Sequence, residues 1–487
     1  MKARIEDRVV YSPYPDIDIP IRSFYSLVAE RLQINPEKLA LRYAVGFQRH
    51  GVLPGDRVCI HLSDSVENLV AMYACAIAGA TLVMAKTSLT EYELRYQAKD
   101  SDSTHILTDV EFTEKVTKAT ASLGMKGFFS MGPADGFVSA ASFASLNERE
   151  FQECPVLDPE STMMAVCYTS GSTGMPKGVE ITHYNFVSCF YTLRKHMPWT
   201  DEEIFLSASP ITHMSGLVLS IMPVLNGACS VIVPAKSTPG QVLDAIDKHK
   251  ATVTVTFPTQ LQSFVREMQR MGRQLPSLRH ISIGGSVVTD WLADAARYTF
   301  GGLRTLQTLY GMTEACILVA AQPTDQDISQ RGSDVGLPTT RVTFKVVDIE
   351  TREKLGPHET GEICFRNATM VRGYYKRPKE TAELFEQDGW MRSGDAGYYD
   401  EDGRLYFSER LKQMIKCMGN QVVPAELEEL LLRKHDDEID EVSVVGLPHS
   451  EYGEAAAAAV VLSEKGRQLD RSDLAERIKA TVKGERQ

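Results

Sequence analysis

The sequence lacks the features that define several protein classes. None of its nine cysteines forms a C-x-x-C pair, and the odd count fits reduced thiols in a cytosol-like compartment better than a disulfide framework or a zinc site. The most apolar long stretch, residues 216–235, is interrupted by serine, proline, asparagine and glycine, so we expect no transmembrane segment. The first residues, MKARIED, lack the apolar core of a secretory signal.

An excess of positive charge is also absent. The chain carries 52 lysines and arginines against 64 aspartates and glutamates, with a formal net charge of −12 and no basic cluster. A protein without a positive patch has no electrostatic footprint for nucleic acid, and we predict no nucleic-acid partner. Hydrophobic residues make up 43% of the chain and charged residues 24%, which excludes disorder as its main state.

Alternating strand-like and helix-like patterns indicate the fold class. Segment 251–257 is β-branched with a period of two and follows a helical pattern over 241–250, and the alanine-rich segment 69–80 is typical of a buried helix. This alternation predicts an α/β protein with mostly parallel sheets covered by helices. At roughly 150 residues per domain, the 487 residues suggest three folding units, or one large domain and a small one.

A domain boundary is expected near residues 400–412. A turn over 398–405 joins two β-like runs, and a later helix begins at Pro424, with proline and acidic residues in its first turn. The remaining residues, about 75, suit one small α+β module. We therefore predict an N-terminal domain of residues 1–411 and a C-terminal domain of residues 412–487.

The most informative segment, residues 169–178, reads TSGSTGMPKG and follows a strand-like run. Its glycines let backbone N–H groups turn toward an anion, its hydroxyls donate hydrogen bonds and its lysine supplies charge, as a polyphosphate requires. An ordinary turn rich in serine and glycine is the alternative. Lys177 stands between Pro176 and Gly178, so the segment is not a Walker loop. The candidate nucleotide-binding residues are Thr169, Ser170, Gly171, Ser172, Thr173, Gly174 and Lys177.

This string resembles the signature loop of the adenylate-forming superfamily, which includes acyl-CoA synthetases, coumarate–CoA ligase-like enzymes, firefly-type luciferases and peptide-synthetase adenylation domains. The resemblance extends over nearly the whole chain. It implies a large N-terminal domain of helix-covered β-sheets with a small β-barrel-like part, followed by a small mobile α+β domain. It also implies ATP, Mg²⁺ and, as co-substrate, coenzyme A.

A second segment, YGMTE at residues 310–314, is similar to another signature of the superfamily. The resemblance implies that the Tyr310 ring stacks on adenine, that Thr313 touches the α-phosphate and that Glu314 helps to hold Mg²⁺. It also makes Gly311 a nucleotide-binding candidate. A carboxylate suits this last role because Mg²⁺ prefers hard oxygen ligands. The alternative is a buried tyrosine beside a capping Thr-Glu pair.

Further segments resemble parts of the same nucleotide site. Gly284, Gly285 and Ser286 match a glycine turn that lies along the adenine and the acyl group, and Asp395 matches an aspartate that binds both ribose hydroxyls. Taken alone, a Gly-Gly or Gly-Asp pair is typical of an ordinary turn. These roles therefore follow from the resemblance.

The segment PITHMSG at residues 210–216 resembles the part of the acyl pocket where a histidine or an aromatic residue closes over the carboxylate. His213 is the candidate, although a lone histidine is more often a core residue. The aspartate that binds the substrate ammonium in amino-acid-adenylating relatives is missing. Instead, an apolar space is expected, lined by Leu217, Val218, Ile317 and Leu318. A hydrophobic carboxylic acid, aromatic or fatty, is the predicted partner.

Residues 409–421 resemble the hinge between the two domains and the loop after it, with Glu409 where relatives usually have aspartate. By this resemblance Arg410 contacts ribose or phosphate and Lys412 is the pivot. Lys416 and Gly419 then face the active site during thioester formation. A solvated surface is the usual alternative for such lysines.

The predicted function is AMP-forming acid–CoA ligation, with Lys177, His213, Thr313, Glu314 and Lys416 as catalytic residues. A nucleotide- or acyl-binding pseudoenzyme and a luciferase-like adenylate oxidase remain as alternatives. We expect a cytoplasmic or peroxisomal location, although the C-terminal ERQ is no peroxisomal signal.

Two differences from the superfamily pattern bear on activity. Relatives have extra residues between the equivalents of 35–41 and 42–44, and they continue past residue 487 to a Gly-Lys motif whose lysine stabilises charge during adenylation. Loss of one such charge costs on the order of 10²–10³ in rate. The sequence is therefore compatible with an incomplete product, a splice variant or a binding protein derived from an enzyme.

Overall fold

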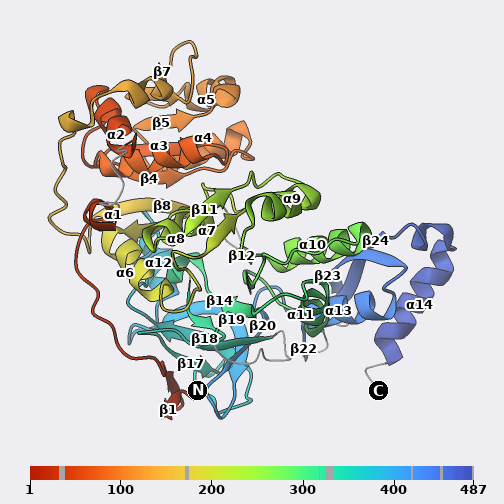
Figure 1. Ribbon diagram of the computed structural model, residues 1–487. Helices are drawn as coiled ribbons and strands as arrows, with labels where there is room; N and C mark the ends of the chain where they lie inside the picture. The colour runs from red at the N-terminus through yellow and green to blue at the C-terminus, as the bar shows by residue number, and fades with distance from the viewer. Residues whose placement is uncertain are drawn as a thin grey trace.

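The computed structural model describes residues 1–31, 39–169, 175–316, 318–324, 333–417, 420–449 and 453–484. Three sheets and their covering helices form these parts of the chain (Figure 1). The predicted α/β class is confirmed. Among the described residues, no helix combines the length and the hydropathy needed to cross a bilayer.

The first sheet has seven strands in the order β7-β6-β5-β3-β4-β8-β9 and is parallel except for the β8–β9 pair. Its strands are β3 (Arg57–His61), β4 (Thr81–Met84), β5 (His105–Thr108), β6 (Gly127–Ser130), β7 (Val138–Ser139), β8 (Met163–Thr169) and β9 (Lys177–Thr182). The α-helices of this part of the chain are α1 (Phe24–Arg31), α2 (Leu39–Arg49), α3 (Val66–Ile77), α4 (Glu91–Asp100), α5 (Thr113–Thr120) and α6 (His183–Leu193). Short 3₁₀ turns are η1 (Val110–Phe112), η2 (Ala140–Ser145) and η3 (Glu148–Glu150).

The second sheet has thirteen strands in the order β1-β2-β17-β18-β19-β20-β16-β15-β14-β13-β12-β10-β11. Its parallel half is β10 (Ile204–Ser207), β11 (Cys229–Ile232), β12 (Val253–Thr256), β13 (His280–Ile283) and β14 (Thr305–Tyr310). The antiparallel half is β1 (Arg4–Glu6), β2 (Val9–Tyr11), β15 (Ala320–Ala321), β16 (Asp334–Pro338), β17 (Thr343–Val347), β18 (Gly361–Arg366), β19 (Met391–Tyr399) and β20 (Leu405–Arg410). This antiparallel half, expected as a barrel-like part, continues the parallel half through the β14–β15 pair.

Helices cover the parallel half of this sheet. They are α7 (Met214–Leu219), α8 (Met222–Leu225), α9 (Pro239–His249), α10 (Pro258–Met271) and α11 (Asp290–Thr299), while η4 (Thr313–Ala315) and α12 (Pro378–Leu384) follow later in the chain. Helix α10 buries Leu261, Phe264, Val265 and Met268, a spacing that places all four on one helical face. Burial of each such side chain stabilises the fold by about 1.5–3 kcal/mol.

A capping residue corrects the predicted start of one helix. The helix expected over 241–250 begins at Pro239, because the Thr238 hydroxyl accepts a hydrogen bond from the backbone N–H of Gln241, and the backbone N–H of Thr238 donates one to the Gln241 side chain. Lys250 takes a left-handed conformation and ends the helix. Helix α3 confirms the buried helix predicted near 69–80.

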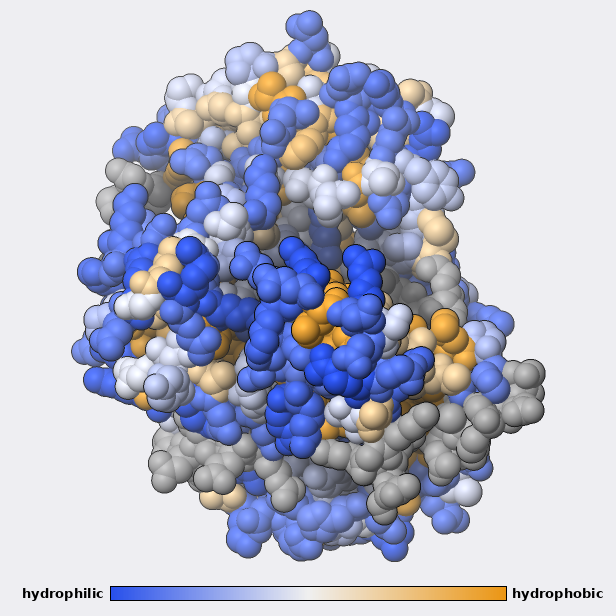
Figure 2. All heavy atoms as spheres, turned by 90° about the vertical axis from the view of Figure 1, so that its right-hand side faces the viewer, coloured by the Kyte–Doolittle hydropathy of each residue, from blue (hydrophilic) through white to orange (hydrophobic). Residues whose placement is uncertain are grey.

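The third sheet is antiparallel, in the order β22-β21-β24-β23. Its strands are β21 (Ile415–Cys417), β22 (Asn420–Val422), β23 (Ile439–His449) and β24 (Gly453–Leu462), and its helices are α13 (Pro424–Lys434), α14 (Arg471–Gly484) and the turn η5 (Gly466–Gln468). These elements lie together at the right of Figure 1. The domain boundary between Leu411 and Lys412 stays a prediction. The face turned to the viewer in Figure 2 is mainly hydrophilic, with small separate hydrophobic areas.

Candidate active site

The predicted site residues gather around one cleft of about 890 Å³. The cleft lies where β8, β9, β12 and β14 end or begin, so segments far apart in the sequence meet there. The predicted residues that line it are Thr169, Lys177, His213, Gly284, Gly285, Gly311, Thr313, Glu314, Asp395 and Arg410.

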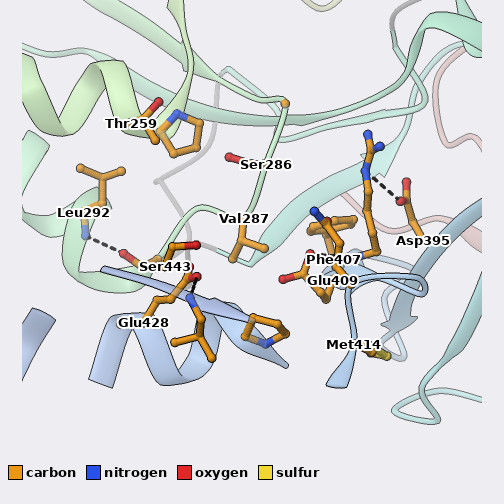
Figure 3. Close-up of a pocket in the computed structure, with 18 of the residues that line it drawn as sticks. Thr259, Ser286, Val287, Leu292, Asp395, Phe407, Glu409, Met414, Glu428 and Ser443 are labelled. Atoms are coloured by element: carbon orange, nitrogen blue, oxygen red, sulfur yellow. Dashed lines mark hydrogen bonds and ion pairs between the residues drawn. The ribbon is translucent and has the colours of Figure 1, made fainter. Parts of the chain in front are cut away.

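A second cavity of about 720 Å³ adjoins the first and shares Gly285, Asp395 and Arg410 with it. It adds the predicted residues Tyr310 and Ser286. Figure 3 shows that Ser286 and Thr259 lie on one side of this cavity and that Glu428 and Ser443, from the C-terminal elements, lie on the other. The nucleotide-site candidates therefore face the small C-terminal sheet.

Some predicted residues cannot be compared with the geometry. Ser170, Gly171, Ser172, Thr173 and Gly174 of the phosphate loop lie outside the described residues, as does Gly419. Lys416 belongs to β21, but the description does not extend to its side chain.

The two ends of the predicted phosphate loop are held beside each other. Thr169 ends β8 and pairs with Lys177, which begins β9. The hydroxyl of Tyr168 donates to Asp100 Oδ2 at 2.9 Å, and the hydroxyl of Tyr96 donates to the carbonyl oxygen of Pro176 at 2.9 Å. Helix α4 therefore anchors both ends of the loop.

Tyr310 and Asp395 are in direct contact. The hydroxyl of Tyr310 donates to Asp395 Oδ2 at 2.8 Å, and the guanidinium Nε of Arg410 lies 3.7 Å from Oδ1. Burial raises the pKa of Asp395 to about 6, while the Tyr310 hydrogen bond and the Arg410 charge oppose this shift. The ring of Tyr310 packs on Phe407, with 5.7 Å between the ring centroids.

A charged network supports the backbone next to Asp395. The N–H of Gly394 donates to Glu362 Oε1 at 3.1 Å, and Glu362 forms an ion pair with Arg352. Arg352 also pairs with Glu386 at 2.7 Å, and Glu386 pairs with Lys345 at 2.6 Å. The side chains of Glu362 and Lys345 are 8% and 7% exposed, so their charges need these partners to remain buried.

Glu314 and Lys177 meet at Tyr374. The hydroxyl of Tyr374 donates to Glu314 Oε1 at 2.8 Å, and the ammonium of Lys177 lies 5.1 Å from the centroid of the Tyr374 ring. Burial and the neighbouring Glu314 carboxylate raise the pKa of the Tyr374 hydroxyl, which therefore stays protonated at neutral pH.

The Glu314 carboxylate is a hard oxygen donor in the cleft wall and fits Mg²⁺. Among the described residues, no group of three or more His, Cys, Asp or Glu side chains could hold a metal ion. An ion bound by Glu314 would therefore need phosphate oxygens and water as its other ligands, as Mg²⁺ bound with a nucleotide commonly has.

His213 caps the N-terminus of α7. Its Nδ1 accepts from the backbone N–H of Ser215 at 3.3 Å and lies 2.8 Å from the Ser215 hydroxyl. Burial, aided by the charge of Lys86, lowers the pKa of His213 to about 4. The ring is therefore neutral at pH 7, and because Nδ1 accepts a hydrogen bond, the proton is on Nε2.

A family model described as "AMP-binding enzyme" matches residues 36–375 of the chain. The chain belongs to this AMP-binding enzyme family. The predicted membership of the adenylate-forming superfamily is thereby confirmed.

Plant ligases are among the sequence relatives of this AMP-binding enzyme. 4-Coumarate–CoA ligase 4 of Arabidopsis thaliana is 32% identical over 448 residues, which cover 89% of this chain and 77% of the relative. 4-Coumarate–CoA ligase 2 of Solanum tuberosum is 29% identical, with 88% and 78% covered. The sequence is therefore related to the AMP-forming acid–CoA ligases, a class of enzymes that use ATP and coenzyme A.

Two solved structures show the same fold. ATP-bound MatB from Rhodopseudomonas palustris superposes with a TM-score of 0.82 at 25% identity, covering 94% of this chain and 92% of MatB. The anthranilate CoA ligase AuaEII in complex with anthranoyl-AMP gives a TM-score of 0.85 at 20% identity, covering 95% and 91%.

The apolar wall of this AMP-binding enzyme differs from the prediction. Leu318 lines the cleft, whereas Leu217 and Val218 are completely buried in the core and Ile317 lies outside the described residues. Met214, Ser215 and Leu219 line the cleft from α7, because this face of the helix is turned toward it. Further apolar lining comes from Met84, Leu193, Met197, Val255, Phe257 and Met312.

Sequence reasoning missed several residues that position the site. Asp64 accepts hydrogen bonds from the backbone N–H groups of Ile211 at 2.7 Å and Ala235 at 2.8 Å, which fixes the segment before His213. Tyr374 and Glu362 were missed as well. The Gly-Tyr-Tyr string around Tyr374 carries no spacing that distinguishes it from an ordinary loop.

The connection to the C-terminal sheet begins at the same site. Arg410 ends β20 in register with Asp395 of β19, and the backbone N–H of Leu411 donates to the carbonyl oxygen of Gly394 at 2.9 Å. Lys412, the predicted pivot, lines both cavities. A change in the backbone conformation at Lys412 would thus act on residues that are bonded to the strand of Asp395.

Proposed function

We propose that the chain activates a hydrophobic carboxylic acid with ATP, forming an acyl-adenylate and pyrophosphate, and transfers the acyl group to coenzyme A with release of AMP. The observation that carries this proposal is that Lys177, Glu314 and Asp395 line one cleft together with an apolar wall. Lys177 suits the phosphates, Glu314 a divalent cation and Asp395 the ribose, and the apolar wall suits an acyl group.

In the first half-reaction, a carboxylate oxygen attacks the α-phosphorus and the bond to pyrophosphate breaks. Two anions must approach each other, so positioning and charge stabilisation supply most of the catalysis. We assign charge stabilisation to Lys177 and a hydrogen bond on the α-phosphate to Thr313. Mg²⁺, when held by Glu314, supplies further neutralisation of the phosphate oxygens.

Asp395 receives hydrogen bonds from the ribose, while Tyr310, Gly284, Gly285, Ser286 and Gly311 surround the adenine. His213 closes the acyl end as a neutral group, because a low pKa of about 4 leaves it uncharged. Burial of the acyl group contributes about 0.8 kcal/mol per CH₂.

In the second half-reaction, the coenzyme A thiol attacks the acyl carbon and AMP leaves. The cavity between Ser286 and Ser443 adjoins Asp395 and is our candidate entrance for the thiol. For this step we assign a contact with ribose or phosphate to Arg410 and the role of pivot to Lys412. We also propose that Lys416 and Gly419 then face the active site. Eight of the nine cysteines are free in the structure, which supports a reducing compartment, and we propose the cytoplasm or the peroxisome.

The test is to incubate the chain with ATP, Mg²⁺, coenzyme A and a panel of aromatic and fatty acids, and to measure AMP and acid-dependent ATP–pyrophosphate exchange. Both should depend on the acid, and Lys177→Ala and Glu314→Ala should abolish both. Saturable ATP binding with no AMP would instead identify a binding protein. Light emission or oxygen uptake without acyl-CoA would identify an adenylate oxidase.

A further inference from the structure

We propose that Tyr374 is a positioning residue that holds two charged groups with two parts of its side chain: its hydroxyl orients the Glu314 carboxylate and its ring holds the Lys177 ammonium. The inference rests on the proposed function, because it takes a magnesium-bound nucleotide as the ligand. Tyr374 itself lines the cleft beside both groups.

The hydroxyl contact fixes the direction of the carboxylate. Tyr374 Oη donates to Glu314 Oε1 at 2.8 Å, and Glu314 is only 6% exposed. One carboxylate oxygen is thus engaged by the protein, which leaves Oε2 to a cation in a set orientation. A buried carboxylate that is held before the metal arrives loses less rotational freedom on binding it.

The ring contact concerns Lys177. Its ammonium lies 5.1 Å from the ring centroid of Tyr374, within the range of a cation–π interaction. Among the described residues, no carboxylate forms an ion pair with Lys177. The aromatic face therefore places the ammonium without neutralising it, and the full charge stays available to a phosphate.

The backbone of Tyr374 is held on the same strand that carries Lys177. Tyr374 forms a bridge with Val179 of β9, and the N–H of Tyr375 donates to the carbonyl oxygen of Gly178 at 2.7 Å. The N–H of Tyr374 donates to Thr381 Oγ1 at 2.9 Å. These bonds fix the backbone of Tyr374 beside the strand that carries Lys177.

The experiment is isothermal titration calorimetry of ATP against the full chain, with EDTA and at increasing Mg²⁺ concentrations. Tyr374→Phe removes the hydroxyl and keeps the ring. Its affinity for metal-free ATP should equal that of the wild type, whereas the Mg²⁺ concentration that gives half of the metal effect should rise about 10-fold, as expected for loss of a hydrogen bond to a charged group.

Tyr374→Leu removes the ring as well, so it should in addition weaken metal-free ATP binding by about threefold. Tyr375→Phe is the matched control, because this neighbouring hydroxyl donates to Asp102 at 2.8 Å and lies outside the cleft wall. It should behave as the wild type in both titrations.

Equal Mg²⁺ midpoints in Tyr374→Phe, Tyr375→Phe and the wild type would overturn the inference. If the leucine variant fails to fold by circular dichroism, the two phenylalanine variants still decide the matter. A wild-type chain that binds no ATP at any Mg²⁺ concentration would overturn the proposed function, a result distinct from unchanged midpoints.

Discussion

Asp395 combines two properties that oppose each other. Its side chain is buried, with only 5% of the residue exposed, and this favours the neutral acid. The proposed contact with both ribose hydroxyls, however, needs a carboxylate that accepts two hydrogen bonds. The Tyr310 hydroxyl and the Arg410 guanidinium limit the shift, and the pKa is raised only to about 6. The carboxylate is thus mostly ionised at pH 7 and mostly protonated at pH 5.

Adenosine binding should therefore depend on pH through this residue. Because the ionised form is the better acceptor, affinity should rise from pH 5 to pH 7, by up to about 10-fold for one charge-assisted hydrogen bond. Adenosine is chosen because it carries no phosphate that titrates in the same range. The measurement is fluorescence or calorimetric titration at pH 5, 6 and 7.

The variant Asp395→Asn provides the control for this prediction. It should bind adenosine weakly at every pH, with no rise between pH 5 and pH 7. A wild-type profile that is equally flat would show that the ionisation of Asp395 does not contribute to ribose binding.

Among the elements, α7 packs directly against the turn that precedes it, next to the site. A Cβ at Gly216 would lie 1.8 Å from the carbonyl oxygen of Pro210, and that oxygen accepts the backbone N–H of His213 at 3.0 Å. The absence of a side chain at Gly216 therefore allows α7 to lie against the turn that presents His213.

Gly216→Ala should force this turn and α7 apart. We expect a loss of about 2 kcal/mol in the free energy of unfolding, as for other overpacked cores, and a higher KM for the acid in ATP–pyrophosphate exchange. Urea unfolding and the exchange assay measure the two effects. Gly301→Ala is the control, since no atom lies within 4 Å of a Cβ at that position, and it should change stability by less than about 0.5 kcal/mol. Equal results for both variants would contradict the packing argument.

The elements also show what could be predicted from sequence. Strands β8 and β12 follow from local patterns of apolar and β-branched residues, because side-chain periodicity reports on the backbone directly. The signature segments placed Lys177, Glu314 and Asp395 in one site through resemblance.

Contacts made by residues far apart in the chain could not be predicted in this way. Tyr374 reaches Glu314 across 60 positions and Asp64 reaches Ile211 across 147, and neither has a local pattern. The same limit explains the error at Leu217 and Val218: the segment is apolar on several sides, so the sequence does not reveal which face of α7 meets the cleft.

At the scale of the whole molecule, the link from β20 to β21 connects the nucleotide site to the C-terminal sheet. Arg410 is in register with Asp395, and β21 begins at Ile415. If the proposed two half-reactions need different placements of this sheet, the backbone at Lys412 must be able to change.

Lys412→Pro should therefore separate the two half-reactions. Proline fixes φ near −65° and restricts the preceding residue, so acid-dependent ATP–pyrophosphate exchange should stay within about threefold of the wild type while acyl-CoA formation falls at least about 10-fold. Gln413→Ala controls for a change at the neighbouring position and should retain both activities. An equal loss of both activities in Lys412→Pro would argue for a purely static role of the link.

The continuity of the thirteen-stranded sheet has a mechanical consequence. Tyr310 in β14 and Asp395 in β19 belong to this one sheet, whereas Lys177 belongs to the seven-stranded sheet. The nucleoside part of the nucleotide would contact the thirteen-stranded sheet alone, but its phosphates would contact both sheets. A relative movement of the two sheets would therefore weaken the contacts to the phosphates, while the contacts to the base and the sugar would be kept.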